Sequence, residues 1–555
     1  MKSLITFFIF FFFLNSFGQK NLYLKIIGQN EKQTKIIDSI SYNKSFGNAK
    51  GIIDENKLFS EKLLKFGFLE QELLENKKQN DSIFVYQYNI GVNTKFIHIY
   101  IGTNYEEQNW SIYKVENDTL TLPFSESELF LNSTLKKLEA KGFSMAKVKL
   151  ANIKKHKGYI VAELKITSDK KRQLNDIVIN GYIKFPEGHK NNLKRLYKKR
   201  IFNQDNIDKL YKDISQYRFI KQTKYPEILF TKDSTKVFVY IEKAKANNFD
   251  GFIGFSNDEN KKVIFNGYLD LTLNNALNSG EKMALYWKSN GKDQKTFNLG
   301  IEIPYIFKSP IGLKTQLNIF KQDSTYQNTQ TAIDFGYYFN YNTRLYLGYQ
   351  SAESSDIKNQ NTSSLSDYKN KFYTTNFEFL EYKNDDFLFP EKSNVNIKIG
   401  TGRRDSKFQN NTQFFGSVNL KHNFYLNNKN VFNIKSQNYY LQSDEYIINE
   451  LYRFGGINSI RGFNENSLQG NIFSSVLTEY RYILSPSMYV HSIIDYAYFQ
   501  DKTTNLKGNL IGIGFGFGIL TKNGLLNLIY ANGSTKDQAI NFSNSIVHIS
   551  LKTLF

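Results

Sequence analysis

The chain of 555 residues contains no cysteine. This absence excludes disulfide bonds, thiolate metal sites, cysteine nucleophiles and any lipid carried on a cysteine. After residue 20, no stretch supplies the roughly 20 consecutive apolar residues that a membrane-spanning helix requires. The sequence therefore excludes a helical membrane protein.

Signals for enzyme chemistry are also missing from the sequence. The six histidines lie far apart and show no metal-ligand spacing. No Gly-x-Ser-x-Gly nucleophile motif is present, and the glycine run at 512–518 lacks the following helix of a phosphate-binding loop. We expect a protein that is not an enzyme and that uses neither a cofactor nor a metal.

Basic residues outnumber acidic residues, 72 against 52, which gives a formal net charge of +20. They are scattered along the chain, and no known nucleic-acid-binding motif accompanies them. The densest basic patch, between Lys171 and Arg200, is read as a solvated helix face or a face near anionic lipid head groups. We expect no nucleic acid partner.

Residues 1–18 have the pattern of an export signal. A charged start at Lys2 precedes an apolar run that is too short to span a membrane, and small residues lead to Gly18. We expect cleavage after Gly18 and a mature chain that works outside the cytoplasm.

Between residues 19 and 246, strand and helix patterns recur about every 70 to 80 residues. We predict three small α+β modules over 19–102, 103–170 and 171–246. The expected elements of the first module are a strand at 22–28, a helix at 57–75 and a hairpin of 83–88 with 95–101. The later modules are expected to contain a helix ending near 139, strands at 146–153, 159–167 and 174–180, helices at 191–199 and 204–218, and a hairpin of 227–231 with 236–243.

A glycine followed by an aromatic residue ends a helix in two of these modules, at Gly67-Phe68 and Gly142-Phe143. This order of elements resembles the polypeptide-transport-associated (POTRA) module. The resemblance implies open edge strands that accept a client strand by β-augmentation. On pattern alone, three α+β modules of unknown role are the alternative.

From residue 247 to 555, alternating strand patterns replace helical periodicity, and aromatic residues make up 16% of the whole chain. About sixteen such segments predict a transmembrane antiparallel β-barrel, with a soluble β-sandwich as the alternative. Examples are 263–273, 282–287, 297–304, 311–320, 344–349, 372–382, 395–401 and 431–439.

Two of the late strand patterns carry further information. Residues 511–519 alternate apolar residues with glycine, which predicts a lumen face crowded by an inserted loop. The final segment places apolar residues at alternate positions and ends the chain on an aromatic residue, which by resemblance to outer-membrane barrels is an assembly signal. The residues of this expected signal are Val547, Ile549, Leu551 and Phe555.

A glycine-rich loop at 447–471 lies between the eleventh and twelfth expected strands. It contains Gly455, Gly456 and the run Ile460-Arg461-Gly462-Phe463. A surface loop whose glycines serve turns is the plain alternative. The position of Arg461 inside a barrel pattern favours a loop whose backbone must approach another part of the protein closely.

Three POTRA-like modules, about sixteen strands and the Ile460-Arg461-Gly462-Phe463 motif together resemble the BamA/TamA superfamily, also called the bacterial surface antigen family. The layout is most similar to TamA-like members. The resemblance implies that the loop folds into the lumen and that Arg461 meets acidic residues on the next two strands. Glu479 and Asp495 occupy those strands, and strand parity turns both of them inward. Which of the two is the main partner stays open.

The resemblance implies a factor that captures unfolded outer-membrane proteins and helps them to fold into the outer membrane of a diderm bacterium, with the modules in the periplasm. Outer-membrane lipid and periplasmic or inner-membrane assembly proteins are the other expected partners. The alternative function is a two-partner-secretion pore that passes one polypeptide through its lumen. A passive structural or adhesion barrel is a third reading, which the Arg461 motif disfavours.

Overall fold

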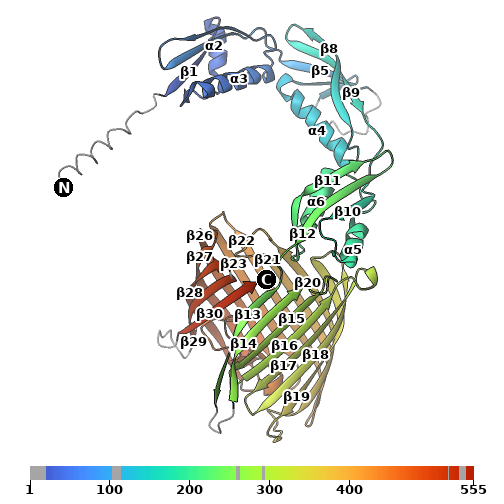
Figure 1. Cartoon of the computed structure of the whole chain (residues 1–555), viewed down its shortest axis with the longest axis vertical. Helices are drawn as coiled ribbons and strands as arrows, with labels where there is room; N and C mark the ends of the chain where they lie inside the picture. Colours follow the sequence, from blue (N-terminus) through green and yellow to red (C-terminus); the bar gives the residue numbers. More distant parts are fainter. Residues whose placement is uncertain (1–20, 103–113, 258–262, 291–293, 523, 537–544) are drawn as a thin grey trace, which may run out of the picture. The chain divides into compact units, whose positions relative to one another are not determined.

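The computed structural model describes residues 21–102, 114–257, 263–290, 294–522, 524–536 and 545–555 (Figure 1). The expected export signal, residues 1–18, lies outside these ranges. The chain forms two compact units, residues 1–172 with 201–204 and residues 173–200 with 205–555. Among the described residues, no helix is both long enough and apolar enough to span a membrane.

The first module packs two helices against a four-stranded sheet in which β1 runs parallel to β4. Its core joins apolar residues of the strands and helices, such as Ile26, Phe59 and Leu63. The elements are β1 (Leu22–Gly28), α2 (Glu31–Asp38), β2 (Ser45–Phe46), α3 (Ala49–Lys65), β3 (Glu72–Lys78) and β4 (Ile83–Asn89), and the sheet order is β2-β1-β4-β3.

Helix α3 does not occupy its predicted range of 57–75. The side chain of Asn48 accepts a hydrogen bond of 2.9 Å from the backbone N–H of Gly51, so the helix begins directly after Asn48. Gly67 adopts a φ of +93°, which terminates the helical path and lets the chain enter β3. The predicted range is therefore wrong at both ends.

The second module contains a five-stranded sheet with order β6-β7-β5-β9-β8. Its elements are β5 (Phe96–Tyr100), β6 (Lys114–Glu116), β7 (Thr119–Pro123), α4 (Ser127–Ala140), β8 (Lys147–His156) and β9 (Tyr159–Thr167). The predicted hairpin of 83–88 with 95–101 is wrong, because β5 pairs with β7 and β9 while β3 pairs with β4. Ile97 and Ile99 of β5 point into the core of this second module.

The third module belongs to the second unit, together with the barrel. It consists of β10 (Asp176–Asn180), α5 (Glu187–Tyr197), α6 (Gln204–Ser215), β11 (Ile220–Phe230) and β12 (Thr235–Lys243), with sheet order β10-β12-β11. Ile207, Leu210 and Ile214 recur at helical spacing on α6 and are buried, which makes α6 amphipathic.

Sixteen strands of the described residues form a closed antiparallel barrel, so the predicted fold class is confirmed. In order around the barrel they are β13 (Asn248–Asn257), β14 (Val263–Asn274), β15 (Lys282–Asn290), β16 (Gln294–Ile303), β17 (Ile311–Gln322), β18 (Tyr326–Tyr338), β19 (Thr343–Asp356), β20 (Tyr368–Tyr382), β21 (Glu391–Ser406), β22 (Asn410–Tyr425), β23 (Asn430–Gln442), β26 (Ile472–Ser485), β27 (Met488–Asp501), β28 (Leu506–Thr521), β29 (Gly524–Thr535) and β30 (Ile546–Leu554).

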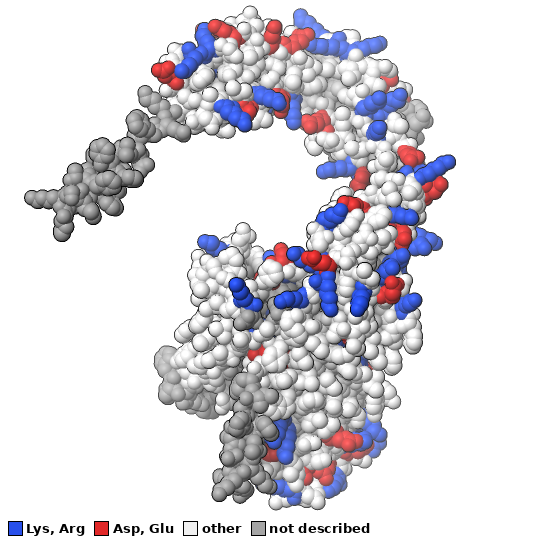
Figure 2. All heavy atoms as spheres, in the orientation of Figure 1, with Lys and Arg blue, Asp and Glu red and all other residues white. Residues whose placement is uncertain are grey.

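The barrel strands alternate outward apolar and inward polar or small residues. On β27, Val490, Ile494 and Tyr496 are exposed on the outside, whereas Asp495 and Ala497 are fully buried. Figure 2 shows the resulting distribution on one face of the barrel, where charged side chains gather toward the two ends and the wall between them carries almost none. An outer wall with exposed apolar residues and few charges is typical of barrels that sit in a bilayer.

The barrel closes at a seam between its first strand, β13, and its last strand, β30. Among the described residues, these two strands pair only at Asn248 with Leu554 and at Phe249 with Thr553. On its other side, β13 pairs with β14 along its entire length. Because neighbouring strands elsewhere are paired over most of their length, the seam is the weakest junction in the wall.

The loop between β23 and β26, the eleventh and twelfth strands of the barrel, folds inward. It contains a 3-10 turn (Ile448–Glu450) and a small hairpin of β24 (Tyr452–Phe454) with β25 (Leu468–Gly470). Phe454 and Ile460 of the loop pack with Phe473 and Leu477 of β26 in one buried cluster. The loop is therefore held against the inner wall by apolar as well as polar contacts.

Candidate functional site

Glycines on two barrel strands make room for the loop. A Cβ atom added at Gly512 of β28 would lie 2.4 Å from the carbonyl oxygen of Arg461. A Cβ atom added at Gly533 of β29 would lie 2.4 Å from the carbonyl oxygen of Gly462. The loop backbone lies this close to the wall only because neither strand residue has a side chain. The predicted use of the glycine run, to admit the inserted loop, is confirmed at Gly512 and wrong for the other three glycines. A Cβ atom at Gly514, Gly516 or Gly518 would meet residues of the neighbouring strands β27 and β29 instead.

The three loop glycines have different roles. Gly462, with a φ of +85°, faces the wall, because a Cβ atom there would lie 2.3 Å from the backbone nitrogen of Gly533. Gly455 and Gly456 also have positive φ values, +108° and +95°, but their neighbours are residues of the loop itself. The plain reading as turn glycines therefore fits Gly455 and Gly456, whereas Gly462 serves the contact with the barrel.

The guanidinium of Arg461 forms a two-pronged interaction with Asp495 of β27. Its Nε donates to Oδ2 at 2.8 Å and its Nη2 donates to Oδ1 at 2.6 Å, while the backbone N–H of Arg461 donates to Oδ2 at 3.1 Å. Asp495 is 0% exposed and Arg461 is 4% exposed. This geometry pairs and orients two charges that are both almost fully buried.

Glu479 of β26 accepts from Nη1 of Arg461, but it shares its charge with a second arginine. Nε of Arg481 donates to Oε2 of Glu479 at 2.7 Å, and Arg481 also donates to the side chain of Asn423 at 3.0 Å. The structure thus brings Arg461 together with both acids. Asp495 receives all its recorded side-chain bonds from Arg461, so it is the more dedicated partner.

Arg481 is a member of this network that sequence reasoning missed. It lies two residues after Glu479 on the same strand, so strand parity alone turns both side chains to the lumen. Its guanidinium lies 4.4 Å from the centre of the Phe389 ring, a cation–π contact that holds it beside Glu479.

A second buried ion pair anchors the first half of the loop. Nη1 of Arg404, on β21, lies 2.5 Å from Oε1 of Glu450, and Gln413 donates to Oε2 of Glu450 at 2.9 Å. The Arg404 side chain is 1% exposed and that of Glu450 is 2% exposed. Parity could have placed Arg404 in the lumen, but no periodicity assigns a direction to Glu450 in an irregular loop.

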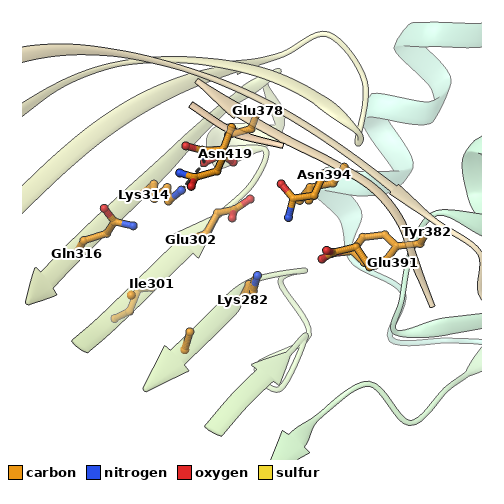
Figure 3. Close-up of a pocket in the computed structure, with 14 residues that line it drawn as sticks. Lys282, Ile301, Glu302, Lys314, Gln316, Glu378, Tyr382, Glu391, Asn394 and Asn419 are labelled. Atoms are coloured by element: carbon orange, nitrogen blue, oxygen red, sulfur yellow. Dashed lines mark hydrogen bonds and ion pairs between the residues drawn. The ribbon is translucent and has the colours of Figure 1, made fainter. Parts of the chain in front are cut away.

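Two polar cavities lie in the lumen. The first has a volume of about 340 Å³, and its lining includes the charged residues Lys282, Glu302, Lys314 and Glu378 of β15, β16, β17 and β20 (Figure 3). The second, of about 360 Å³, reaches Arg461. The cavities adjoin because both are lined by Glu391, Asn394 and Asn419. No three His, Cys, Asp or Glu side chains in the described ranges are placed to hold a metal ion.

The third module is fixed to the rim of the barrel around His189 of α5. This imidazole is 0% exposed, and its ring contacts aromatic rings from the module and from the barrel, such as Tyr217 and Tyr305. Neither ring nitrogen has a hydrogen-bond partner in the described structure. Burial, assisted by the positive charge of Arg344 and opposed by Glu302, lowers the pKa of His189 to about 3.

Polar contacts surround this aromatic cluster and complete the attachment. Arg195 donates to the carbonyl oxygen of Tyr338 at 3.1 Å, and the backbone N–H of Tyr382 donates to Oε1 of Gln216 at 2.7 Å. These bonds link α5, and the residue that follows α6, to barrel strands. The third module and the barrel therefore form one body.

The residues of the expected C-terminal signal lie on the outside of β30. Val547, Ile549 and Leu551 are exposed at alternate positions, and the terminal Phe555 is also exposed. Phe555 exchanges backbone hydrogen bonds of 3.0 and 3.3 Å with Asn247, beside the short seam. Their role as an assembly signal stays a prediction.

Comparison with known proteins agrees with this geometry. Residues 275–546 match the family model described as the Omp85 superfamily domain. No curated protein matches the chain by sequence.

Two solved structures of CdiB share the fold, and a solved structure of BamA is similar at a lower TM-score. CdiB from Escherichia coli is 12% identical with a TM-score of 0.51, over 90% of this chain and 97% of that chain. CdiB from Acinetobacter baumannii is 14% identical with a TM-score of 0.51, over 77% and 81% of the two chains. BamA from Haemophilus ducreyi lacking POTRA domains 1–3 is 15% identical with a TM-score of 0.45, over 78% and 94%. At these identities the likeness concerns the fold alone.

Proposed function

We propose that this chain is an assembly factor for outer-membrane proteins, because residues 275–546 of its barrel match the Omp85 superfamily domain. In this proposal the three modules lie in the periplasm of a diderm bacterium and capture unfolded clients. The barrel then helps these clients to fold into the outer membrane. The process is non-covalent and involves no catalytic residue, cofactor or metal.

The short seam is the observation that carries this proposal. Strands β13 and β30 pair only at Asn248–Leu554 and Phe249–Thr553 in the described part of the chain. Separating them breaks few backbone hydrogen bonds and exposes strand edges with free N–H and C=O groups. In lipid such edges must find partners, and an incoming client strand supplies them.

The loop holds strands β26 to β29 together on one side of the seam. Arg461 joins the loop to β26 and β27 through Glu479 and Asp495, and Gly512 and Gly533 admit its backbone to β28 and β29. These four strands directly precede β30. We expect them to stay together with the loop while the seam opens.

Edge strands of the modules support the capture step. Strand β3 ends the first sheet, and every residue of it is exposed. Strands β8 and β11 end the sheets of the second and third modules. An unfolded client can add to such an edge through backbone hydrogen bonds, which makes recognition tolerant of sequence. Further periplasmic or inner-membrane assembly proteins would use the same kind of edge.

The second candidate function is that of a two-partner-secretion pore. The two adjoining polar cavities favour it, because a translocated polypeptide needs a hydrated path through the lumen. The buried Arg404–Glu450 pair disfavours it, because the loop that it anchors must move before anything passes.

Reconstitution in lipid vesicles tests the proposal. The full chain is inserted into vesicles, a urea-unfolded barrel client is added, and protease-resistant client is measured over time. We expect faster folding than in vesicles without the protein, and loss of the gain when Phe249→Cys and Thr553→Cys are joined by a disulfide across the seam. Because the natural chain has no cysteine, these two thiols have no other thiol of the same chain to pair with. Equal folding with and without the protein would contradict the proposal.

A further inference from the structure

The inserted loop crosses the inside of the seam. Arg461 contacts β26, β27 and β28, and Gly462 and Phe463 lie against Gly533 of β29. Two residues later, Glu465 contacts β15. Strand β15 is third in the barrel, whereas β26 to β29 are the twelfth to fifteenth strands, so the seam between β30 and β13 lies between the two sets. Residues 461–465, here called the seam strap, therefore join its two sides.

Glu465 makes the attachment on the far side of the seam. Its carboxylate pairs with the ammonium of Lys288 and accepts a hydrogen bond of 3.2 Å from the hydroxyl of Tyr286. Lys288 and Tyr286 are two residues apart on β15, so they share its inner face. The backbone of Gly456 packs closely against the strap, since a Cβ atom there would lie 3.0 Å from Cα of Glu465.

The two attachments of the strap differ in strength. At one end, Arg461 and Asp495 are buried and joined by two parallel hydrogen bonds. At the other end, the side chains of Glu465 and Lys288 are each 27% exposed. Partly solvated ion pairs contribute less to stability than buried, fully bonded pairs. A strain that pulls the seam apart will therefore release Glu465 before it releases Arg461.

We propose that Glu465 is a positioning residue for the seam. Its ion pair with Lys288 acts as a latch that joins β15, and through it β14 and β13, to strands β26 to β29. The backbone pairing of β13 with β30 is too short to hold the seam alone, and the latch adds a side-chain link on the lumen side. Opening then requires the latch to break, after which the strap stays with the C-terminal strands. This inference rests on the proposed opening of the seam.

Disulfide trapping measures seam closure directly. The full chain carrying Phe249→Cys and Thr553→Cys is purified in lipid, and the initial rate of disulfide formation under mild oxidation is followed on gels. We expect Glu465→Gln and Lys288→Met each to slow trapping by about threefold, the scale of a partly exposed ion pair. Reversal of both charges, Glu465→Lys with Lys288→Glu, should restore part of the rate, because the pair is remade in the opposite sense.

A second lumen pair provides a matched control. Glu391 and Lys421 are 3.0 Å apart with side chains 29% and 33% exposed, and they join β21 to β22, far around the barrel from the seam. Glu391→Gln should leave the trapping rate unchanged. A Glu465→Gln protein that is trapped as fast as its parent, or a Glu391→Gln protein that is slowed equally, would overturn the latch.

The outcome for the latch can be separated from that for the proposed function. Trapping reports only on the seam and needs no client, whereas the vesicle assay reports on client folding. Unchanged trapping in Glu465→Gln, together with client folding that the seam disulfide blocks, would reject the latch and keep the assembly function. Slowed trapping in Glu465→Gln, together with no acceleration of client folding by the parent protein, would keep the latch and reject the assembly function.

Discussion

At Arg461 one guanidinium joins a loop to two neighbouring strands, and the two acids that receive it are not equivalent. Asp495 is wholly buried and its recorded side-chain bonds all come from Arg461, whereas Glu479 also holds Arg481. Asp495→Asn leaves a buried guanidinium without its main counter-charge, so we expect it to destabilise the barrel by about 3–5 kcal/mol. Glu479→Gln should cost about 1–3 kcal/mol, because Arg461 keeps Asp495 while Arg481 keeps Asn423 and the Phe389 ring.

Samples of the two variants, at equal expression, are heated to increasing temperatures and run on gels that are not heated themselves. The temperature at which the band of folded protein disappears is compared. Asp495→Asn should show the larger decrease. A larger decrease for Glu479→Gln would show that Asp495 is not the dominant acid of this network.

Arg461 itself is tested by two substitutions. Arg461→Ala should leave the barrel in the outer membrane but lower both its heat stability and its assembly activity, because the loop loses its anchor. Arg461→Lys keeps the charge but cannot form both bonds to Asp495, so an intermediate loss is expected. Membrane fractionation followed by gel mobility and complementation measures this series. Full complementation by Arg461→Ala with unchanged mobility would show that the loop needs no lock.

Among the elements, the glycine-bearing strands explain why the loop can lie against the wall. Gly512→Ala would place a methyl group 2.4 Å from the carbonyl oxygen of Arg461, so the loop must shift away. We expect a loss of about 1–3 kcal/mol, the usual scale of overpacking, measured as heat stability. Gly300→Ala is the control, because Gly300 lines a lumen cavity and a Cβ atom there meets nothing within 4 Å. Equal behaviour of the two variants would contradict the close approach.

The junction of the third module with the barrel should depend on pH through His189. Its pKa is about 3 when docked, below the usual value of about 6.5 for a free histidine. As pH falls from about 6.5 toward 3, His189 becomes protonated in the undocked state but stays neutral in the docked state. Docking is therefore fully stable above this pH range and weakens as the pH falls through it. Hydrogen exchange of α5 in the full chain should therefore accelerate between about pH 7 and pH 5 beyond the intrinsic pH effect.

A His189→Phe variant should lose this extra pH dependence, because phenylalanine fits an aromatic surrounding and does not titrate. His156→Phe, a change of the exposed imidazole that stacks on Tyr159 at 4.9 Å, is the control and should behave as the parent. An unchanged pH dependence in His189→Phe would assign the effect to other groups.

Sequence patterns predicted regular elements better than irregular ones. Strand parity was enough to turn Glu479 and Asp495 inward, because the barrel strands are long and their side chains alternate strictly. Helix α3 was misplaced, because its start depends on the Asn48 cap and its end on the backbone of Gly67. The partners Glu450 and Glu465 could not be foreseen, because both lie in an irregular loop where no period fixes the direction of a side chain.

For the whole molecule, the described structure combines a barrel that is weak at one junction with a loop that is anchored on both sides of it. The third module is attached to the same body, and β11 is an edge strand of its sheet. An assembly factor needs these features, since a client must be captured, offered an edge and released into lipid. A secretion pore shares the fold but has to move the loop from its lumen.

Depletion of the protein in its source bacterium, followed by quantitative proteomics of the outer membrane and the medium, tests the assembly function most directly. We expect many different β-barrel proteins to decrease together in the outer membrane, and an Asp495→Asn copy to restore them less well than the parent copy. An intact set of outer-membrane barrels together with the loss of one exported polypeptide from the medium would contradict the assembly function and would establish the secretion pore.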